Sequence, residues 1–206
     1  MSHHLSQLFK EIVLWSSGFL FFSITCIILF CIGVNYYNGS IFCASTATPW
    51  GVITAMFIHL NFPHLVGNLV NLFIILGWVL FISKQFDLPL LSGRTLLALS
   101  LGSSCLAISA WLIFSLIVGY NGRLAGASGV VCGLLGFLGA QLFFLIISSE
   151  YPQKIFGFIL WFILFVPYSA SFLNSGNVFG HAFSLLSGLI LGILLLKRRI
   201  KACSTT

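Results

Sequence analysis

A serine and a histidine stand at comparable places in two apolar segments of this sequence. Ser128 lies in a Gly-Ala-Ser-Gly string at 126–129, at the mouth of one segment, and His181 follows a glycine at the mouth of another. A serine hydroxyl becomes a good nucleophile when an adjacent base removes its proton. The two residues are therefore predicted to act as nucleophile and general base.

A second polar pair lies at the start of an earlier apolar segment. The string Asn-Phe-Pro-His at 61–64 predicts a helix start, because proline is favoured in the first turn. His64 and Asn68 are then four residues apart on one helix face. Together with the backbone N–H at Ser128, which begins a helix with a positive end, they are predicted to form an oxyanion hole.

The composition defines the kind of protein that carries these residues. Of 206 residues, 59% are hydrophobic and only 6% are charged, whereas soluble domains are about 25% charged. The chain is therefore predicted to cross a membrane several times. Its net charge of +6 does not indicate a nucleic-acid partner, because four of the nine basic residues directly follow the last apolar stretch, where they anchor the topology.

Six apolar stretches are long enough to span a bilayer, which takes about 20 residues each. They lie near 12–33, 62–83, 95–117, 128–148, 154–173 and 179–196. The breaks between them are short and no internal repeat is visible. We therefore expect an all-α membrane protein of six transmembrane helices, with residues 1–206 forming a single domain.

The basic residues predict the orientation. With both termini cytoplasmic, eight of the nine basic residues lie inside and only Arg123 lies outside, as the positive-inside rule demands. An inner membrane of the cell is the expected location. In this topology His64, Asn68, Ser128 and His181 all lie near the outer surface, and such a polar cluster in a membrane protein predicts a functional site.

The acidic residues exclude other protease classes. Glu11, Asp87 and Glu150 are the only carboxylates, and all three lie at the predicted cytoplasmic edge, so a catalytic pair of aspartates is excluded. No His-Glu-x-x-His string is present for a zinc protease. His59 and His64 are five residues apart, a poor spacing for one helix face. A metal site made by histidines stays a minor alternative, and we expect neither a metal nor a cofactor.

These motifs together resemble the rhomboid intramembrane serine proteases. The resemblance rests on His59, His64 and Asn68, then Gly-x-Ser-Gly at 126–129, then Gly-His at 180–181 followed by small residues, in the same order and on the same spans. It implies that Ser128 is the nucleophile and His181 the base. It also implies that His64, Asn68 and the backbone at Ser128 are the oxyanion donors, and that His59 is structural.

The same resemblance implies the substrate. Rhomboid proteases cut single-span transmembrane proteins near the outer end of the span, and admit them from the lipid between spans two and five. Four aromatic residues of span five either serve this entry or pack between helices: Phe158, Trp161, Phe162 and Phe165.

The chain departs from the family pattern at three positions. Gly51 replaces an arginine, Cys132 replaces a frequent tyrosine, and Ser184 replaces the first glycine after the Gly-His pair. Two other functions stay open, a catalytically inactive relative that binds transmembrane clients and a small six-span transporter. The glycines of spans four and six also fit close helix packing without any catalysis.

Overall fold

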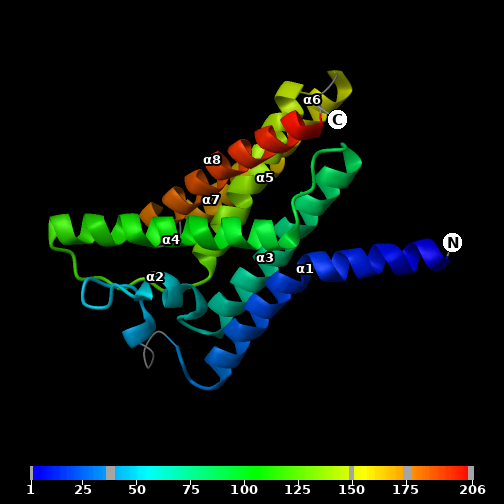
Figure 1. Ribbon diagram of the computed structural model, residues 1–206. Coiled ribbons are helices and arrows are strands. Elements are labelled where there is room, and N and C mark those ends of the chain that lie inside the picture. The colour runs from blue at the N-terminus through cyan, green and yellow to red at the C-terminus, as the bar shows by residue number, and fades with distance from the viewer. Residues whose placement is uncertain (1, 36–39, 149–150, 174–177, 204–206) are drawn as a thin grey trace.

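The chain folds into a bundle of long helices in the computed structural model, which describes residues 2–35, 40–148, 151–173 and 178–203 (Figure 1). Six helices are long and apolar enough to cross a membrane, which confirms the predicted all-α membrane fold. The described residues contain no β-strand, and only two isolated bridges, one of which joins Ala44 to Leu124, tie the loops together.

The elements follow one another in this order: α1 (Ser2–Cys31), η1 (Ser40–Phe42), α2 (Gly51–Thr54), η2 (Ala55–Phe57), α3 (Phe62–Gln85), α4 (Gly93–Val118), α5 (Ser128–Ser148), α6 (Tyr151–Leu160), η3 (Trp161–Phe165), α7 (Val166–Leu173) and α8 (Val178–Cys203). The spans are α1, α3, α4, α5, the α6–η3–α7 unit and α8.

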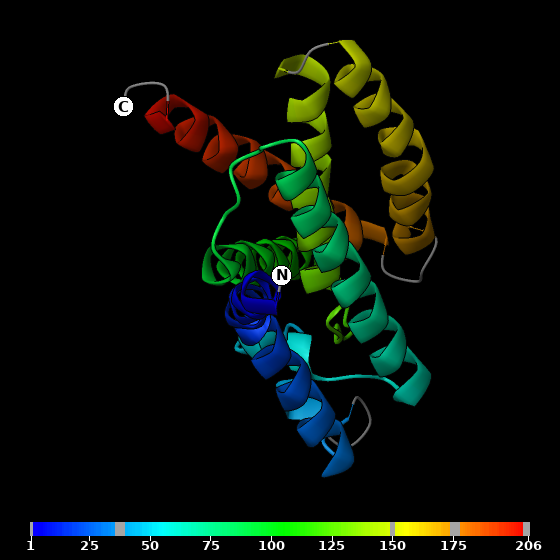
Figure 2. The same ribbon diagram turned by 90° about the vertical axis from the view of Figure 1, so that its right-hand side faces the viewer.

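Helix α5 lies at the centre of the bundle. About 83% of its apolar stretch is buried inside the protein, against at most 39% in any of the other five spans. It is packed against α3, α4, α6 and α8 (Figures 1 and 2). The residue that begins this helix therefore has a fixed position relative to all the helices around it.

Glycines let α8 approach α5 to backbone contact. A side chain at Gly188 would collide with the carbonyl oxygen of Gly133, and one at Gly136 would collide with the carbonyl oxygen of Leu185. The hydrophobic effect is absent between helices in lipid, and such small-residue contacts drive the association of the helices there. The packing role expected for these glycines is confirmed.

The other side of α5 uses small residues in the same way against α4. A Cβ at Gly133 would lie 2.8 Å from the Cβ of Ser103, and one at Gly129 would lie 2.5 Å from the Oγ of Ser104. Both serines are fully buried. Thus α4 and α8 reach α5 at the same level, close to its first residue.

Helix α3 starts as its sequence predicts. Asn61 caps it, accepting a hydrogen bond of 2.9 Å from the backbone N–H of His64, and Pro63 lies in the first turn. Near its other end, Ser83 receives a hydrogen bond of 2.6 Å from the Gln141 side chain of α5. Because both residues are buried, this bond fixes α3 lengthwise against the central helix.

The fifth span is irregular. Its middle part, η3, is a π-helical segment, and Pro167 follows it in α7. Proline has no N–H to donate to the carbonyl four residues earlier, which explains why regular α-helical bonding stops there. The ring of Phe165 fills the notch left by Gly139 of α5, so packing is the role of this aromatic residue.

Candidate active site

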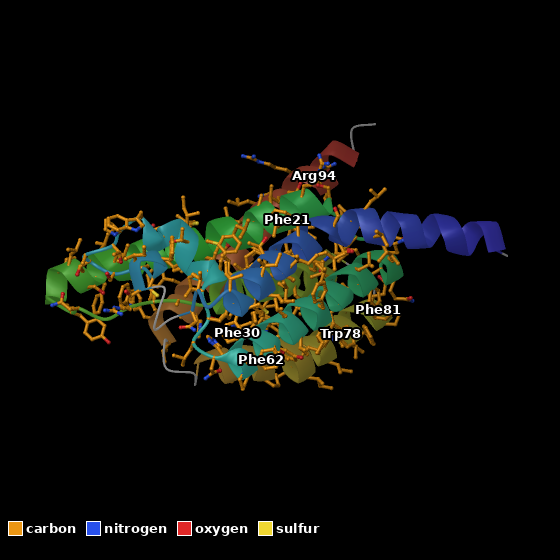
Figure 3. All side chains as sticks on the ribbon, turned by 90° about the horizontal axis from the view of Figure 1, so that it is seen from below. Phe21, Phe30, Phe62, Trp78, Phe81 and Arg94 are labelled. Carbon is orange, nitrogen blue, oxygen red and sulfur yellow. The ribbon has the colours of Figure 1, made fainter. Side chains whose placement is uncertain are left out.

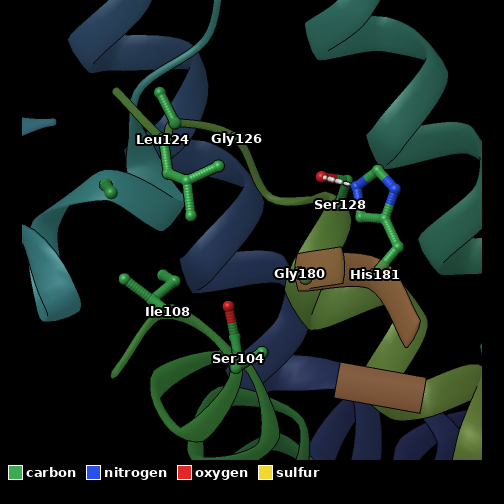
Figure 4. A pocket seen from close by; sticks show the side chains of 11 residues that line it. Ser104, Ile108, Leu124, Gly126, Ser128, Gly180 and His181 are labelled. Carbon is green, nitrogen blue, oxygen red and sulfur yellow. Dashed lines mark hydrogen bonds between the residues drawn. The ribbon is translucent and has the colours of Figure 1, made fainter. Parts of the chain in front are cut away.

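Ser128 and His181 meet at one end of the bundle. Ser128 is the first residue of α5, and His181 lies in the first turn of α8. The Oγ of Ser128 and the Nε2 of His181 are 2.8 Å apart, and the side chains point toward one another (Figure 4). Only 9% of the serine and 7% of the histidine are exposed. A neutral imidazole so placed can accept the hydroxyl proton.

The loop before Ser128 needs a glycine. Gly126 has a φ of +122°, which side chains rarely tolerate, and its N–H donates a hydrogen bond of 2.8 Å to the carbonyl oxygen of Ala55. A Cβ at this position would lie 2.9 Å from the Cε1 of His64 and 3.7 Å from the Oγ of Ser128. Gly126 is therefore where α3, the loop and Ser128 come together.

His59 is hydrogen-bonded to the same loop, which precedes Ser128. Its Nε2 accepts a hydrogen bond of 3.3 Å from the backbone N–H of Ala127, and its Nδ1 lies 3.3 Å from the carbonyl oxygen of Phe57. A carbonyl only accepts, so the proton is on Nδ1 and the ring is neutral. Burial, and to a lesser extent the neighbouring His64, lower the pKa of His59 to about 4. This agrees with the structural role expected for His59.

His64 and Asn68 present buried polar atoms on the same face of α3. The Nδ1 of His64 and the Nδ2 of Asn68 have no hydrogen-bond partner within the described part of the chain. An unsatisfied buried polar atom is costly, so its presence calls for an explanation. The His64 ring borders Gly126 and hence the surroundings of Ser128. Asn68 lies one helical turn further along α3.

A small cavity of about 30 Å³ adjoins the Ser128 and His181 side chains (Figure 4). Ser104 of α4 also lines it, and its buried Oγ has no partner among the described residues. No sequence signal singled out Ser104, because it lies in a run of small residues that reads as helix packing. The rest of the lining is apolar or glycine: Ala55, Ala107, Ile108, Leu124, Ala125, Gly126, Gly129 and Gly180.

Ser184 makes a contact that a glycine could not make. Its hydroxyl donates a hydrogen bond to the carbonyl oxygen of Gly129, the residue after Ser128. Ser184 is three residues after His181, on the same side of α8. The substitution noted in the sequence therefore adds a tie between the two helices that carry Ser128 and His181.

The other two departures have different surroundings. A side chain at Gly51 would collide with the backbone of Cys43 and Ala44, so the arginine of the family pattern has no room there. Cys132 is fully buried one turn after Ser128.

Among the described residues, no three His, Cys, Asp or Glu side chains are grouped so that they could hold a metal ion.

The sequence of residues 46–198 matches the Rhomboid domain family. Since this match covers well over half of the chain, the protein belongs to the Rhomboid family, a family of multi-pass membrane proteins that are usually intramembrane serine proteases. Comparisons with curated proteins and with solved structures each found no match.

Proposed function

We propose that this protein is an intramembrane serine endopeptidase that works with a Ser128–His181 dyad. The observation that carries the proposal is the 2.8 Å contact between Oγ and Nε2, formed by two residues from different helices and buried at one end of the bundle. The pair also borders a cavity, which leaves room for a reacting group beside Ser128. The family assignment supports the same chemistry.

The reaction follows from the positions of the atoms. The Oγ of Ser128 attacks the scissile carbonyl carbon while its proton passes to the Nε2 of His181. The resulting imidazolium then gives this proton to the leaving amine, and the C–N bond breaks. Water, deprotonated by the same imidazole, attacks the acyl-serine ester and releases the new carboxyl end together with the free hydroxyl of Ser128.

The negative charge of the tetrahedral intermediate needs hydrogen-bond donors. Helix α5 begins at Ser128, so the first N–H groups of α5 have no acceptor within the helix. His64 and Asn68 supply further donors, and their partnerless nitrogens fit a group that meets its acceptor only during the reaction. Donors of this kind act mainly on the transition state.

Single-span transmembrane proteins are the proposed substrates, cut near the outer end of the span. Aromatic side chains exposed on α3 and on the fifth span provide apolar surface for such a helix. Trp78 and Phe81 of α3 pack edge to face (Figure 3), and Phe158 and Phe162 of the fifth span each have more than half of their surface exposed. Phe86, which caps α3, contacts Phe156 of α6 at the end remote from Ser128. Entry is therefore proposed nearer to Ser128, where Val66 and Val70 of α3 and Val166 of the fifth span are exposed.

The proposed orientation puts both termini in the cytoplasm and the dyad near the outer face of an inner membrane. Its support is the distribution of basic residues, of which Lys84, Arg94 and Lys154 lie at the ends of their spans remote from Ser128.

Labelling with a fluorophosphonate tests the proposal. The purified protein is expected to react once, at Ser128, and the label is expected to vanish in Ser128→Ala and nearly vanish in His181→Ala. Ser104→Ala is the matched control, because it removes another buried hydroxyl from the same cavity but leaves the dyad intact. Cleavage of a transmembrane substrate should follow the same pattern. A protein that takes no label and cleaves no substrate would be an inactive relative or a transporter, whereas normal cleavage by Ser128→Ala would contradict the role of Ser128 as the nucleophile.

A further inference from the structure

A polar pocket opens between two loops at the Ser128 end of the bundle. Its volume is about 240 Å³. Six residues between positions 40 and 48, after α1, line one side, and Asn121 and Arg123 of the loop between α4 and α5 line the other. The dyad and the oxyanion donors proposed above include none of these residues.

The backbone ties this loop pocket to the candidate active site. Ala44 and Leu124 exchange two hydrogen bonds of 3.0 and 2.9 Å, so the two loops lie side by side. Successive side chains of extended backbone point to opposite sides. Accordingly, Leu124 lines the cavity beside Ser128 (Figure 4), whereas Arg123 lines the loop pocket. Five residues along the chain separate Arg123 from Ser128, so their Cα atoms are at most about 18 Å apart.

Hydrogen bonds within the loop pocket use the hydroxyl protons of three of its residues. Thr48 donates a bond of 2.7 Å to the carbonyl oxygen of Cys43, so the 2.7 Å bond between Thr48 and Ser45 takes its proton from Ser45. Thr46 donates a bond of 3.2 Å to the side-chain oxygen of Asn121. The amide of Asn121 therefore keeps its two N–H donors for an acceptor from outside.

Arg123 brings an unbalanced positive charge to this pocket. The loops at 32–50 and 119–127 contain no Asp or Glu, and Arg123 is their only charged residue. Burial raises the pKa of the nearby Cys43 thiol more than the charge of Arg123 lowers it, so this thiol stays neutral. Arg123 itself is exposed. With the N–H groups of Asn121 beside it, the pocket offers donors and positive charge, which suit an anion.

A carboxylate fits this pocket better than a lipid does. A guanidinium binds a carboxylate through two parallel N–H···O bonds. Apart from Ile41 and Ala47 the lining is polar, so it offers little apolar surface to an acyl chain. A carboxylate is costly within the hydrocarbon, so an acidic residue of a transmembrane substrate must lie outside its span. An extended chain covers about 18 Å in roughly five residues, the distance that limits Arg123 from Ser128.

We propose that Arg123 and Asn121 bind an acidic side chain of the substrate, within about five residues of the scissile bond on its outer side. This inference rests on the proposed protease function and adds a charge preference to it. Arg123 supplies the charge and Asn121 a further donor. A substrate with Asp or Glu in this stretch is therefore bound in preference to the same substrate with Asn or Gln.

Peptide binding to the full chain carrying Ser128→Ala tests this proposal, because the bound peptide stays intact. Pairs of fluorescent transmembrane peptides carry either Asp or Asn, in turn at each of the first five positions outside the span. In a neutral detergent at low salt, the Asp peptide of at least one pair should bind about fivefold more tightly than its Asn partner. Adding Arg123→Gln should bring this ratio to about one. Adding Arg123→Glu should make a Lys peptide bind more tightly than the Asp peptide.

Lys154→Gln is the matched control, because it removes one positive charge at the opposite end of the bundle, and it should leave the ratio near fivefold. Asn121→Ala should lower the ratio about twofold, since it removes one hydrogen bond but no charge. Helicity by circular dichroism verifies that each variant is folded.

Three results would overturn the proposal. They are equal binding of Asp and Asn peptides at all five positions, an unchanged ratio in Arg123→Gln, and loss of the ratio in nanodiscs that contain phosphatidylglycerol. The last would mean that Arg123 holds a lipid phosphate instead.

Cleavage by the protein with Ser128 intact separates this proposal from the proposed function. Equal kcat/KM for the Asp and Asn substrates would refute the charge preference alone. Absence of any cleavage would refute the protease function, whereas the binding ratio measured with Ser128→Ala would still decide whether Arg123 recognises an acid.

Discussion

Ser184 and Gly129 join the two helices of the candidate active site, since the serine hydroxyl of α8 donates to the glycine carbonyl of α5 directly after Ser128. Both residues lie within one helical turn of the dyad, Ser184 after His181 and Gly129 after Ser128. The bond therefore limits sliding and rotation of α8 relative to α5. Its energetic contribution and its effect on the 2.8 Å dyad contact can be measured separately.

Ser184→Ala should lower both stability and turnover. Losing the hydrogen bond should cost about 1 kcal/mol, with some further cost because the Gly129 carbonyl stays buried. Turnover should fall because His181 is held less firmly, while fluorophosphonate labelling persists at a lower rate. Thermal unfolding in detergent and initial cleavage rates provide the measurements. Ser187→Ala, on the same helix, is the control, and an equal effect of both variants would contradict the positional role of Ser184.

Asn68→Ala should lower turnover much more than substrate affinity. Removing one oxyanion donor costs about 100- to 1000-fold in turnover, because the bond forms mainly in the transition state. The measurement is kcat and KM on a transmembrane substrate in detergent or liposomes. Asn71→Ala is the matched control from the same helix. If Asn68→Ala instead changes the unfolding temperature but not kcat, then Asn68 serves in helix packing.

Gly126→Ala should damage the site even though only a methyl group is added. The backbone at φ +122° becomes strained, and the new Cβ would lie 2.9 Å from the ring of His64. We expect a loss of stability of about 1 to 3 kcal/mol and a strong loss of turnover, since His64 must move away. Gly67→Ala is the control, because its Cβ would meet nothing within 4 Å. Similar behaviour of both variants would contradict this role of Gly126.

Stability should fall in mild acid because of His59. Burial holds the pKa of His59 near 4 in the folded protein, whereas an exposed histidine of the unfolded chain binds its proton near pH 6.5. Between these values the unfolded state carries the extra proton, so stability is lost as the pH falls from about 6.5 to 4. The full effect is on the order of 3 kcal/mol.

His59→Gln keeps an acceptor for the N–H of Ala127 but cannot titrate. The difference in unfolding temperature between the wild type and this variant, followed from pH 7 to pH 4, isolates the contribution of His59 from that of the other histidines. The wild type should lose stability more steeply. Parallel curves would show that His59 does not gain a proton on unfolding.

The sequence was sufficient for the spans and for the start of α3, because both depend on local signals. Long apolar runs fix the spans, and proline and asparagine chemistry fixes the start of α3 near Pro63. The pairing of Ser128 with His181 needed the topology and a family resemblance in addition, because the two residues are 53 positions apart.

The remaining features depend on which helix faces meet, and no local pattern encodes that. In the sequence, Ser184 is only a departure from the glycine of the family pattern. The structure shows that its hydroxyl donates a hydrogen bond to the carbonyl oxygen of Gly129. In the sequence, Gly51 is only a departure from the arginine of the family pattern. The structure shows that the backbone of residues 43–44 occupies the space that a side chain at position 51 would need. Ser104 is in a run of small residues, and only the packing of α4 against α5 places it in the same cavity as Ser128.

The central position of α5 has a consequence for biosynthesis. Ser128 begins the fourth span, but its partner His181 comes from the sixth, 53 residues later. At about 5–20 residues per second, a ribosome takes roughly 3 to 10 seconds to make that stretch. During this interval the glycine-lined side of α5 lacks α8, and Ser128 lacks the contact with His181. On the proposed mechanism, the growing chain therefore carries no activated nucleophile while neighbouring nascent proteins enter the same membrane.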